Sequence, residues 1–385
     1  MSANAPTPVY LDYNATTPVA PEVLAAMLPW LAEDFGNPSS DHAFGQRAAG
    51  AVRTARREVA DLIGATPEEI IFTGSATEAN NLAIVGVARA LAGKKRHLVI
   101  SAVEHPAVVA PALRLQEQGW ALSVVAVDAF GRVDPVAVAA ALRPDTALVS
   151  IMHANNEVGT VQPIAEIARL LKAAGVFLHV DAAQSAGKLP VDVNELGADL
   201  LTLAGHKFYA PKGIGALYVR AATPIVSIIA GAGQERGLRS GTESVPLIVA
   251  LGAAARLAKA RQAEAAPRLR LLRDRLHAQL LAEIPGLQLN GHPEFRLSNT
   301  LHVSFPGISG KALLAACADE VAASLGSACH AHGDAVSGVL TAMGCDAARA
   351  VGAVRLSVGW DTSLVEIDQV AAALIRSHRR LTQQN

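Results

Sequence analysis

A single lysine between an apolar run and two aromatic side chains is the first residue of this sequence suited to chemistry. Lys207 follows the apolar residues 200–203, with His206 before it and Phe208 after it. An amine at the end of a buried strand is costly unless it is neutral or bonded. A Schiff base to an aldehyde cofactor would satisfy the amine and make it catalytic. A lysine that reaches solvent from the strand end is the alternative that this segment leaves open.

A second segment, upstream of the lysine, ends in an acid. Residues 177–180 are typical of a buried strand, and Asp181 follows them. Pyridoxal phosphate needs a carboxylate against its pyridine nitrogen, because the protonated ring takes up electrons from the substrate Cα. Asp181 and Lys207 both follow apolar strands, at the carboxyl ends where open α/β sheets bind ligands. Taken alone, Asp181 is equally suited to cap a helix that begins at Ala182.

Further polar residues also stand at element junctions. The turn at residues 73–77, which includes Ala76 and Thr77, lies between a predicted strand and a predicted helix, where backbone N–H groups suit a phosphate. His105 follows another strand, and its imidazole suits stacking on a pyridine ring and proton transfer. The amides of Asn156 and Gln184 suit the ring hydroxyl of such a cofactor. Each residue alone is also compatible with a purely structural role.

One late cysteine lies among small residues. Small neighbours make the Cys329 thiol accessible, and His330 and His332 could hold it as a thiolate. Cys317, in contrast, lies in an apolar helical pattern that predicts an inert buried thiol. A metal site made of Cys329, these histidines and Asp334 matches no standard zinc spacing, so we expect no metal site.

Arginines mark two more places of interest. Arg355 lies on a predicted strand whose apolar residues face the other way, so it could grip a substrate carboxylate with two N–H groups or pair with an acid of the protein. The glycine-rich segment 231–242 carries Arg236 and Arg239, which predicts either an anion or an acid nearby, or a solvated loop.

Strands and helices alternate from about residue 50 to residue 220, which favours a mostly parallel sheet covered on both faces. Beyond Gly241 the pattern changes to long helices over 245–283, alternating strands and an amphipathic helix over 364–381, as in a smaller α+β domain. The alternating region from about residue 50 to residue 220 contains predicted strands at 70–72, 98–101 and 147–152. Its predicted helices cover 52–63 and begin at Glu78 and at Pro163.

Size and charge narrow the function. The chain has 385 residues and a formal net charge of −1, so nothing favours nucleic acid or an anionic membrane as a partner. No apolar run is long enough to span a membrane, and residues 1–9 show no secretory signal. The three cysteines are too far apart for a disulfide framework, so we expect a reducing cytoplasm.

In this order and at these separations, the motifs resemble those of the cysteine desulfurases and selenocysteine lyases, in class V of the fold-type I pyridoxal-phosphate enzymes. The resemblance runs nearly end to end. Its motifs are Tyr10-Leu11-Asp12-Tyr13-Asn14-Ala15-Thr16-Thr17-Pro18, Gly36-Asn37-Pro38-Ser39-Ser40, Glu104-His105, Asn155-Asn156-Glu157, Asp181-Ala182-Ala183-Gln184, Gly205-His206-Lys207, Arg239-Ser240-Gly241-Thr242 and Arg355-Leu356-Ser357-Val358-Gly359.

The resemblance implies a fold and a division of the chain. A large pyridoxal-phosphate-binding domain over residues 15–258 would hold a mostly parallel seven-stranded sheet flanked by helices. Residues 1–14 and 259–385 would form a smaller α+β domain that carries the Cys329 loop. A homodimer is implied as well.

The resemblance also implies roles for individual residues. Lys207 would hold the cofactor as a Schiff base, Asp181 would pair with the pyridine nitrogen, and His105 would stack on the ring and act in acid–base steps. The remaining contacts would come from Asn156 and Gln184 near the ring hydroxyl, from Ala76, Thr77 and His206 at the phosphate, and from Thr242 of the partner subunit at the same phosphate.

The implied activity is removal of sulfur from L-cysteine to give L-alanine and a persulfide on Cys329, which a sulfur-acceptor protein could receive. Asn14, Asn156 and Arg355 would bind the substrate. Two departures from the family pattern bear on this activity: Ala204 replaces a serine of many desulfurases, and His330 replaces a serine or threonine of those that supply iron–sulfur scaffolds.

Three other activities stay open. The Cys329-His330 pair is similar to selenocysteine lyases, so release of selenium from L-selenocysteine is a rival activity. A β-lyase acting on another small β-substituted amino acid is another. A class V aminotransferase would keep Lys207 and Asp181 but would need no accessible cysteine.

Overall fold

The central element of the protein is a seven-stranded sheet. The structure, a computed structural model, describes residues 7–326 and 337–383. In spatial order the strands are β2 (Ile70–Thr73), β8 (Gly215–Val219), β7 (Leu200–Ala204), β6 (Phe177–Asp181), β5 (Thr146–Met152), β3 (His97–Ser101) and β4 (Ala121–Val125). The pairs from β7 to β4 are parallel, and β8 is antiparallel to both of its neighbours. The predicted seven-stranded, mostly parallel sheet is confirmed.

Both faces of the sheet are covered, which explains why its strands are apolar at successive positions. Neighbouring residues of one strand enter different cores: Val99 packs into one core, whereas Leu98 and Ile100 pack into another on the opposite face. The second of these faces is covered by α4 (Ala76–Leu91) and α5 (Pro106–Glu117). The first is covered by α3 (Ala43–Leu62), α7 (Ile164–Ala174) and the first part of α9 (Val245–Glu283).

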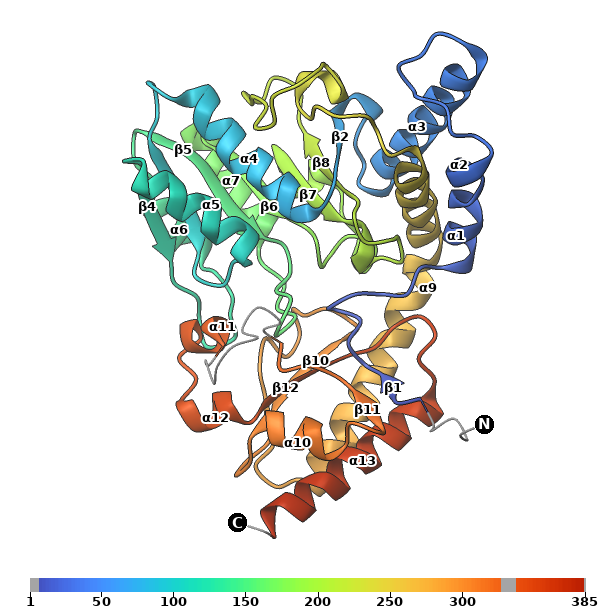
Figure 1. Cartoon of the computed structure of the whole chain (residues 1–385). Helices are drawn as coiled ribbons and strands as arrows, with labels where there is room; N and C mark the ends of the chain where they lie inside the picture. Colours follow the sequence, from blue (N-terminus) through green and yellow to red (C-terminus); the bar gives the residue numbers. More distant parts are fainter. Residues whose placement is uncertain (1–6, 327–336, 384–385) are drawn as a thin grey trace.

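Shorter elements complete this part of the chain. They are α1 (Pro21–Met27), α2 (Pro29–Ala32), α6 (Pro135–Ala140), α8 (Val193–Leu196) and the 3-10 helices η1 (Pro67–Glu69), η2 (Gly205–Lys207) and η3 (Glu235–Gly237). Helix α1 packs on α9, on the right-hand side of Figure 1.

A second group of elements lies below the large sheet in Figure 1 and has its own core. Its antiparallel sheet has the order β12-β10-β9, and β1 pairs with β11 in parallel. The elements are β1 (Val9–Tyr10), β9 (Gln288–Leu289), β10 (Thr300–Ser304), α10 (Gly310–Ala316), β11 (Val321–Ala322), α11 (Gly338–Ala342), α12 (Ala347–Val351), β12 (Ala353–Ser357) and α13 (Leu364–Thr382).

One helix, α9, passes through both cores. Its residues up to Ala258 belong to the core of the large sheet, and those from Leu269 belong to the second core. At the N-terminal end, Leu11 belongs to the second core and Tyr13 to the first. The predicted division into residues 15–258 and residues 1–14 plus 259–385 stays a proposal, and Tyr13, inside the range predicted for the smaller domain, packs in the core of the large sheet.

The segment after Asp181 forms turns rather than the helix that was one alternative for it. Helix α4 begins at Ala76, two residues before the predicted start, because Ser75 accepts a hydrogen bond from the Glu78 N–H and caps the helix. Within residues 7–326 and 337–383, no helix combines the length and the apolar character that a membrane span needs.

Candidate active site

A cavity of about 300 Å³ opens at the carboxyl ends of β5, β6 and β7. It is the place where an open α/β sheet is expected to bind its ligand. The predicted site residues that line it are Asn14, Ala76, Thr77, His105, Asn156, Asp181, Gln184, His206, Lys207 and Arg355. The structure therefore brings together residues that are up to 341 positions apart (355 − 14).

Two predicted residues are not in this group. Thr242 is exposed and does not line the cavity of its own chain. Cys329 lies outside the described residues, as do His330, His332 and Asp334. Among the residues that the structure does describe, no three His, Cys, Asp or Glu side chains come together as metal ligands would.

Lys207 directs its amine inward rather than to solvent. Its Nζ donates hydrogen bonds to the carbonyl oxygens of Asn14 (2.7 Å) and Ala15 (2.8 Å). The residue lies on η2, directly after β7, so the short helix turns the side chain from the strand end into the cavity. The solvent-reaching alternative for this lysine is wrong.

Asp181 is held by two donors at the end of β6. Its Oδ2 accepts from Asn80 Nδ2 (2.8 Å), and its Oδ1 accepts from the Ala183 N–H (2.9 Å). Asn80 comes from α4 and is 1% exposed. Sequence reasoning missed Asn80. The available signal was a polar residue on a helix face that is otherwise apolar, between Ala79 and Leu82.

His105 faces the cavity as a neutral imidazole. It is the N-cap of α5, where its Nδ1 accepts a hydrogen bond from the Ala107 N–H (3.1 Å). A ring nitrogen that accepts carries no proton, so the proton sits on Nε2. Burial lowers the pKa of His105, which favours the same neutral form.

The start of α4 also lines the cavity and has the features that suit an anion. The first-turn N–H groups of a helix have no intrahelical partner, and those of Ala76 and Thr77 border the cavity. Gly215 lets this helix start pack against β8, because a Cβ there would come within 2.9 Å of the Ala76 nitrogen. His206 lies nearby, and burial lowers its pKa to about 4.

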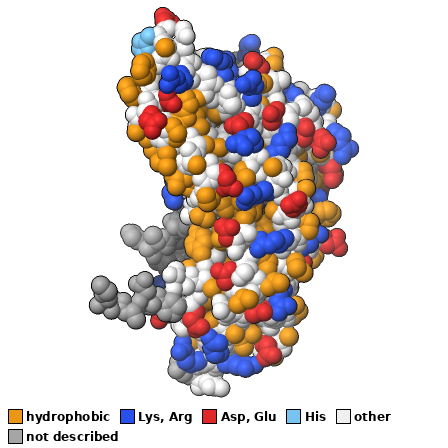
Figure 2. Space-filling view, turned by 90° about the vertical axis from the view of Figure 1, so that its right-hand side faces the viewer, with side chains coloured by type: hydrophobic (Ala, Val, Ile, Leu, Met, Phe, Trp, Pro, Cys, Tyr) orange, Lys and Arg blue, Asp and Glu red, His pale blue; other side chains and the backbone are white. Residues whose placement is uncertain are grey.

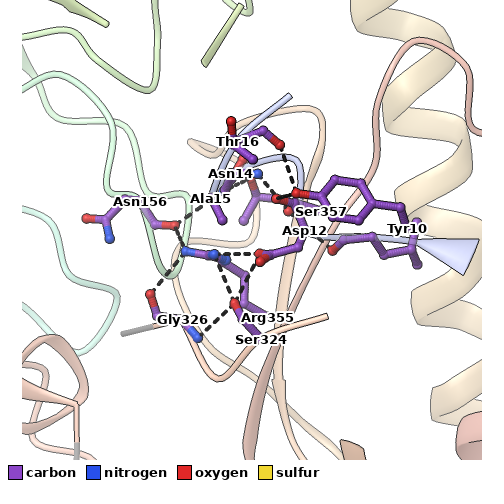
Figure 3. A network of polar contacts seen from close by, with 12 residues as sticks. Tyr10, Asp12, Asn14, Ala15, Thr16, Asn156, Ser324, Gly326, Arg355 and Ser357 are labelled. Carbon is purple, nitrogen blue, oxygen red and sulfur yellow. Dashed lines mark hydrogen bonds and ion pairs between the residues drawn. The ribbon is translucent and has the colours of Figure 1, made fainter. Parts of the chain in front are cut away.

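Arg355 occupies the opposite wall of the cavity in a dense polar network (Figure 3). Its Nη1 donates to the carbonyl oxygens of Asn156 (2.9 Å) and Gly326 (3.0 Å). Its Nη2 donates to Asp12 Oδ1 (2.7 Å) and Ser324 Oγ (2.9 Å). Only Nε is buried without an acceptor among the described residues. The acid that sequence analysis left unnamed as an alternative partner of Arg355 is thus Asp12.

The acid near the glycine-rich segment is Glu78, since Arg239 Nε donates to its Oε1 at 2.8 Å. Two further ionisable residues lie near the site: Lys188, which sequence reasoning missed, and Glu104, which it named only as part of the Glu104-His105 motif. Lys188 bonds to both Asn14 and Gln184. Glu104 accepts from Ser101 Oγ and from the Met152 N–H, and burial raises its pKa to about 8.

The two described cysteines are poor nucleophiles. Cys317 is 3% exposed, as its apolar pattern predicted, and burial raises its pKa to about 11. Burial also raises the pKa of Cys345. Because the thiolate is the reactive form, neither competes with Cys329 for a catalytic role.

Comparison with known proteins gives one consistent result. The model of the family described as "Aminotransferase class-V" matches residues 9–370. A protein of Anaeromyxobacter sp. (strain Fw109-5) named "Cysteine desulfurase IscS" is 49% identical over 378 residues, which cover 97% of this chain and 93% of that protein. A solved structure named "NifS-like protein" has a TM-score of 0.91 at 37% identity and covers 98% of this chain and 100% of that one. Another, described as "SspA in complex with cysteine", has a TM-score of 0.81 at 39% identity, with 91% and 98% covered.

Proposed function

This chain belongs to the class-V aminotransferase family, and we propose that it is a cysteine desulfurase that depends on pyridoxal 5'-phosphate and forms L-alanine from L-cysteine. The observation that carries the proposal is one cavity that holds the inward-facing amine of Lys207 together with the carboxylate of Asp181. The relative from Anaeromyxobacter and the solved structure that holds cysteine support this choice of substrate.

The residues of the cavity fit this cofactor. Lys207 would bind its aldehyde, and the N–H groups at 76 and 77 with His206 would hold its phosphate. Asp181, fixed by Asn80 and Ala183, would keep a proton on the pyridine nitrogen. When bound, the cofactor supplies a ring that withdraws electrons from the substrate Cα. Lys207 would take the proton from this Cα, and His105 would move protons through Nε2.

Arg355 would bind the substrate carboxylate. Its Nε is buried and has no acceptor among the described residues, so a carboxylate that comes within reach would satisfy this donor. A second donor becomes available when a neutral acceptor, such as the Gly326 carbonyl, gives up its bond to Nη1. Asn14 and Asn156, which border the same wall of the cavity, would complete the substrate contacts.

Cys329 would be the sulfur acceptor within the protein. The described residues on both sides of it are anchored at the cavity: Gly326 lines it, and Ser337 donates to Glu157, another lining residue. The Cys329 thiolate would attack the substrate sulfur and form the S–S bond of a persulfide. The electron pair of the broken C–S bond would remain on the substrate carbon, which takes up a proton to become alanine.

A homodimer would complete the site. Large apolar side chains are exposed from α1 to the start of α3, including the segments that join these helices, namely Leu24, Leu28, Leu31, Phe35 and Phe44. Figure 2 faces the side on which these helices lie and shows hydrophobic side chains gathered along its upper left margin. Such a patch is typical of a protein interface. Thr242, exposed in its own chain, would then be free to reach the phosphate of the partner subunit.

Beyond the dimer, a sulfur-acceptor protein would take the persulfide sulfur from Cys329. A reducing cytoplasm suits this role, because the nucleophile must stay a free thiol. The described cysteines, Cys317 and Cys345, are free thiols as well.

A selenocysteine lyase is the second candidate, and the observation that favours it is His330 next to Cys329. Comparing turnover of L-cysteine and L-selenocysteine by wild type and by Cys329→Ala separates the two. If the protein is a desulfurase, Cys329→Ala should no longer turn over L-cysteine. A lyase keeps releasing selenium without Cys329 and turns over L-cysteine slowly even as wild type.

The proposed function is tested with purified protein, pyridoxal 5'-phosphate and L-cysteine. Wild type is expected to gain the absorbance of bound cofactor and, with dithiothreitol present, to form alanine and sulfide in equal amounts. Lys207→Ala should lose both signals. If wild type binds the cofactor but passes the amino group of L-cysteine to a keto acid and releases no sulfide, the protein is an aminotransferase and the desulfurase proposal fails.

A further inference from the structure

A second lysine lies behind the first. Lys188 follows β6 by seven residues (188 − 181) and lines a small cavity that also contacts Lys207 and Asn299. Its Nζ donates to Gln184 Oε1 (2.8 Å) and to Asn14 Oδ1 (3.0 Å). No carboxylate among the described residues pairs with it. Burying an amine without an acid is costly, and burial lowers its pKa well below the usual value.

The hydrogen bonds of this amine determine which side of two side-chain amides, those of Gln184 and Asn14, faces Lys188. The Lys188 amine donates to an oxygen of each amide, and an amide that accepts such a hydrogen bond must present its oxygen rather than its NH₂ group. The orientation of an amide is otherwise ambiguous, because its oxygen and nitrogen have nearly the same shape. Lys188 thus directs the NH₂ group of Gln184 away from it. It does the same for Asn14 together with Asn299, whose Nδ2 donates to the same Asn14 Oδ1 (3.0 Å).

Each NH₂ group donates to the carbonyl oxygen of a residue that lines the active-site cavity. Gln184 Nε2 donates to the carbonyl oxygen of Asn14 (2.9 Å), the same oxygen that holds the Lys207 amine. Asn14 Nδ2 donates to Thr300 Oγ1 (2.8 Å) and to the Asn156 carbonyl (3.3 Å), which also accepts from Arg355. Figure 3 shows this last arrangement, with Asn14 and Arg355 directed at one carbonyl.

We propose that Lys188 is a positioning residue whose amine fixes the amide groups of Gln184 and Asn14, so that both offer N–H donors on the side of the cavity where the cofactor and substrate bind. Lys188 itself touches neither, because it lines the cavity behind Lys207 and not the active-site cavity. The inference rests on the proposed function, since it concerns donors offered to pyridoxal 5'-phosphate.

The test is a double-mutant cycle on cofactor binding. Lys188→Met keeps the length of the side chain but removes the donor, and Gln184→Leu removes the amide that it orients. The dissociation constant of pyridoxal 5'-phosphate is measured by absorbance for wild type, both single variants and the double variant. Lys212→Met is the matched control, because Lys212 is an exposed lysine whose charge also acts on His206.

We expect Lys188→Met to weaken cofactor binding about tenfold, as loss of one buried hydrogen bond would. In the Gln184→Leu background the same change should weaken cofactor binding less than twofold, because the amide that Lys188 orients towards the cofactor is gone and Asn14 serves the substrate. Lys212→Met should leave the dissociation constant unchanged. If Lys188→Met does not fold, Lys188→Gln, which keeps an NH₂ donor, replaces it in the cycle. Lys188→Gln should weaken cofactor binding in the wild-type background, by less than tenfold, and should not weaken it in the Gln184→Leu background.

Additive effects of Lys188→Met and Gln184→Leu would overturn the inference while the proposed function stands, since wild type would still bind the cofactor. A purely structural role predicts this additive result together with a lower unfolding temperature of the apoprotein. Failure of wild type to bind pyridoxal 5'-phosphate would overturn the proposed function and the inference with it.

Discussion

Asp12 and Arg355 form an ion pair of 2.7 Å that joins the N-terminal segment to β12 at the wall of the cavity. The arginine side chain is 2% exposed and the aspartate side chain 19% exposed. Asp12 neutralises most of the positive charge of Arg355 that a substrate carboxylate would meet there. Three neutral oxygens also accept hydrogen bonds from the guanidinium and hold it in place.

Asp12→Asn should therefore lower the KM for L-cysteine several-fold. The neutral acceptors still position Arg355, but its charge is no longer compensated, so it attracts the substrate carboxylate more strongly. The uncompensated buried charge should lower the free energy of unfolding by about 2 kcal/mol. Steady-state kinetics and denaturant unfolding measure the two effects.

The matched control is Asp368→Asn. Asp368 also pairs with an arginine at 2.7 Å, but Arg275 and Asp368 are both about half exposed. An exposed pair contributes little, so neither KM nor the unfolding midpoint should change. A rise of KM in Asp12→Asn would mean that Asp12 positions Arg355 more than it neutralises it.

Asn80→Leu should weaken binding of pyridoxal 5'-phosphate about tenfold, because Asp181 loses one of its two donors and holds the pyridine nitrogen less firmly. Stability of the apoprotein should change by less than about 1 kcal/mol, since Asn80 Oδ1 is buried without a partner in the part of the chain that the structure describes, and leucine removes this unpaired acceptor. Cofactor titration and thermal unfolding check both statements. Asn81→Leu, one residue along the same helix, should leave cofactor affinity unchanged.

Glu104 predicts a pH dependence of stability. Burial raises its folded-state pKa to about 8, above the unfolded value of about 4.3. Between these values the folded state binds more protons than the unfolded state, so the stability contributed by Glu104 is full below about pH 4 and is lost as pH rises towards 8. Glu104→Gln keeps the acceptor for Ser101 and Met152 and should flatten this part of the stability curve.

Denaturant midpoints of the apoprotein from pH 5 to pH 8 test the prediction. The exposed Glu264 provides the control, and Glu264→Gln should leave the slope as in wild type. Equal slopes for Glu104→Gln and wild type would mean that Glu104 ionises normally in the folded protein.

Cys329→Ala should abolish formation of alanine and sulfide from L-cysteine but keep the absorbance of the bound cofactor, since the cofactor-binding residues are unchanged. Cys345→Ser should keep full activity, because burial raises the pKa of that thiol and it lies outside the lining of the cavity. Alanine formation at the wild-type rate by Cys329→Ala would show that another group attacks the sulfur.

The sequence allowed prediction of the sheet and of the residues that follow its strands. Asp181 and Lys207 end apolar strands, and parallel strands bring their carboxyl ends to one edge, so their proximity follows from the strand pattern. The partners of these residues could not be predicted in the same way. Asn80 lies 101 positions from Asp181, and Asp12 lies 343 positions from Arg355.

Lys188 illustrates the limit most clearly. A lysine in a turn is typical of a solvated surface, and periodicity carries no sign of the amides that surround it. The Lys188 amine lies between Asn14 and Gln184 because residues 182–188 pack against the N-terminal segment that contains Asn14. Long-range pairings of this kind depend on the packing of whole elements rather than on local sequence.

Helix α9 has a mechanical consequence for the cavity. Lys207 belongs to the part of the protein built on the large sheet, and Arg355 belongs to the part built on the small sheet. Helix α9, with 39 residues, packs into the hydrophobic cores of both parts. A continuous helix resists bending, and its only internal proline, Pro267, lies between the two sets of buried residues. The distance between the Lys207 amine and the Arg355 guanidinium therefore depends on how far α9 bends at Pro267. The same bend determines the size of the amino acid that fits between the two groups.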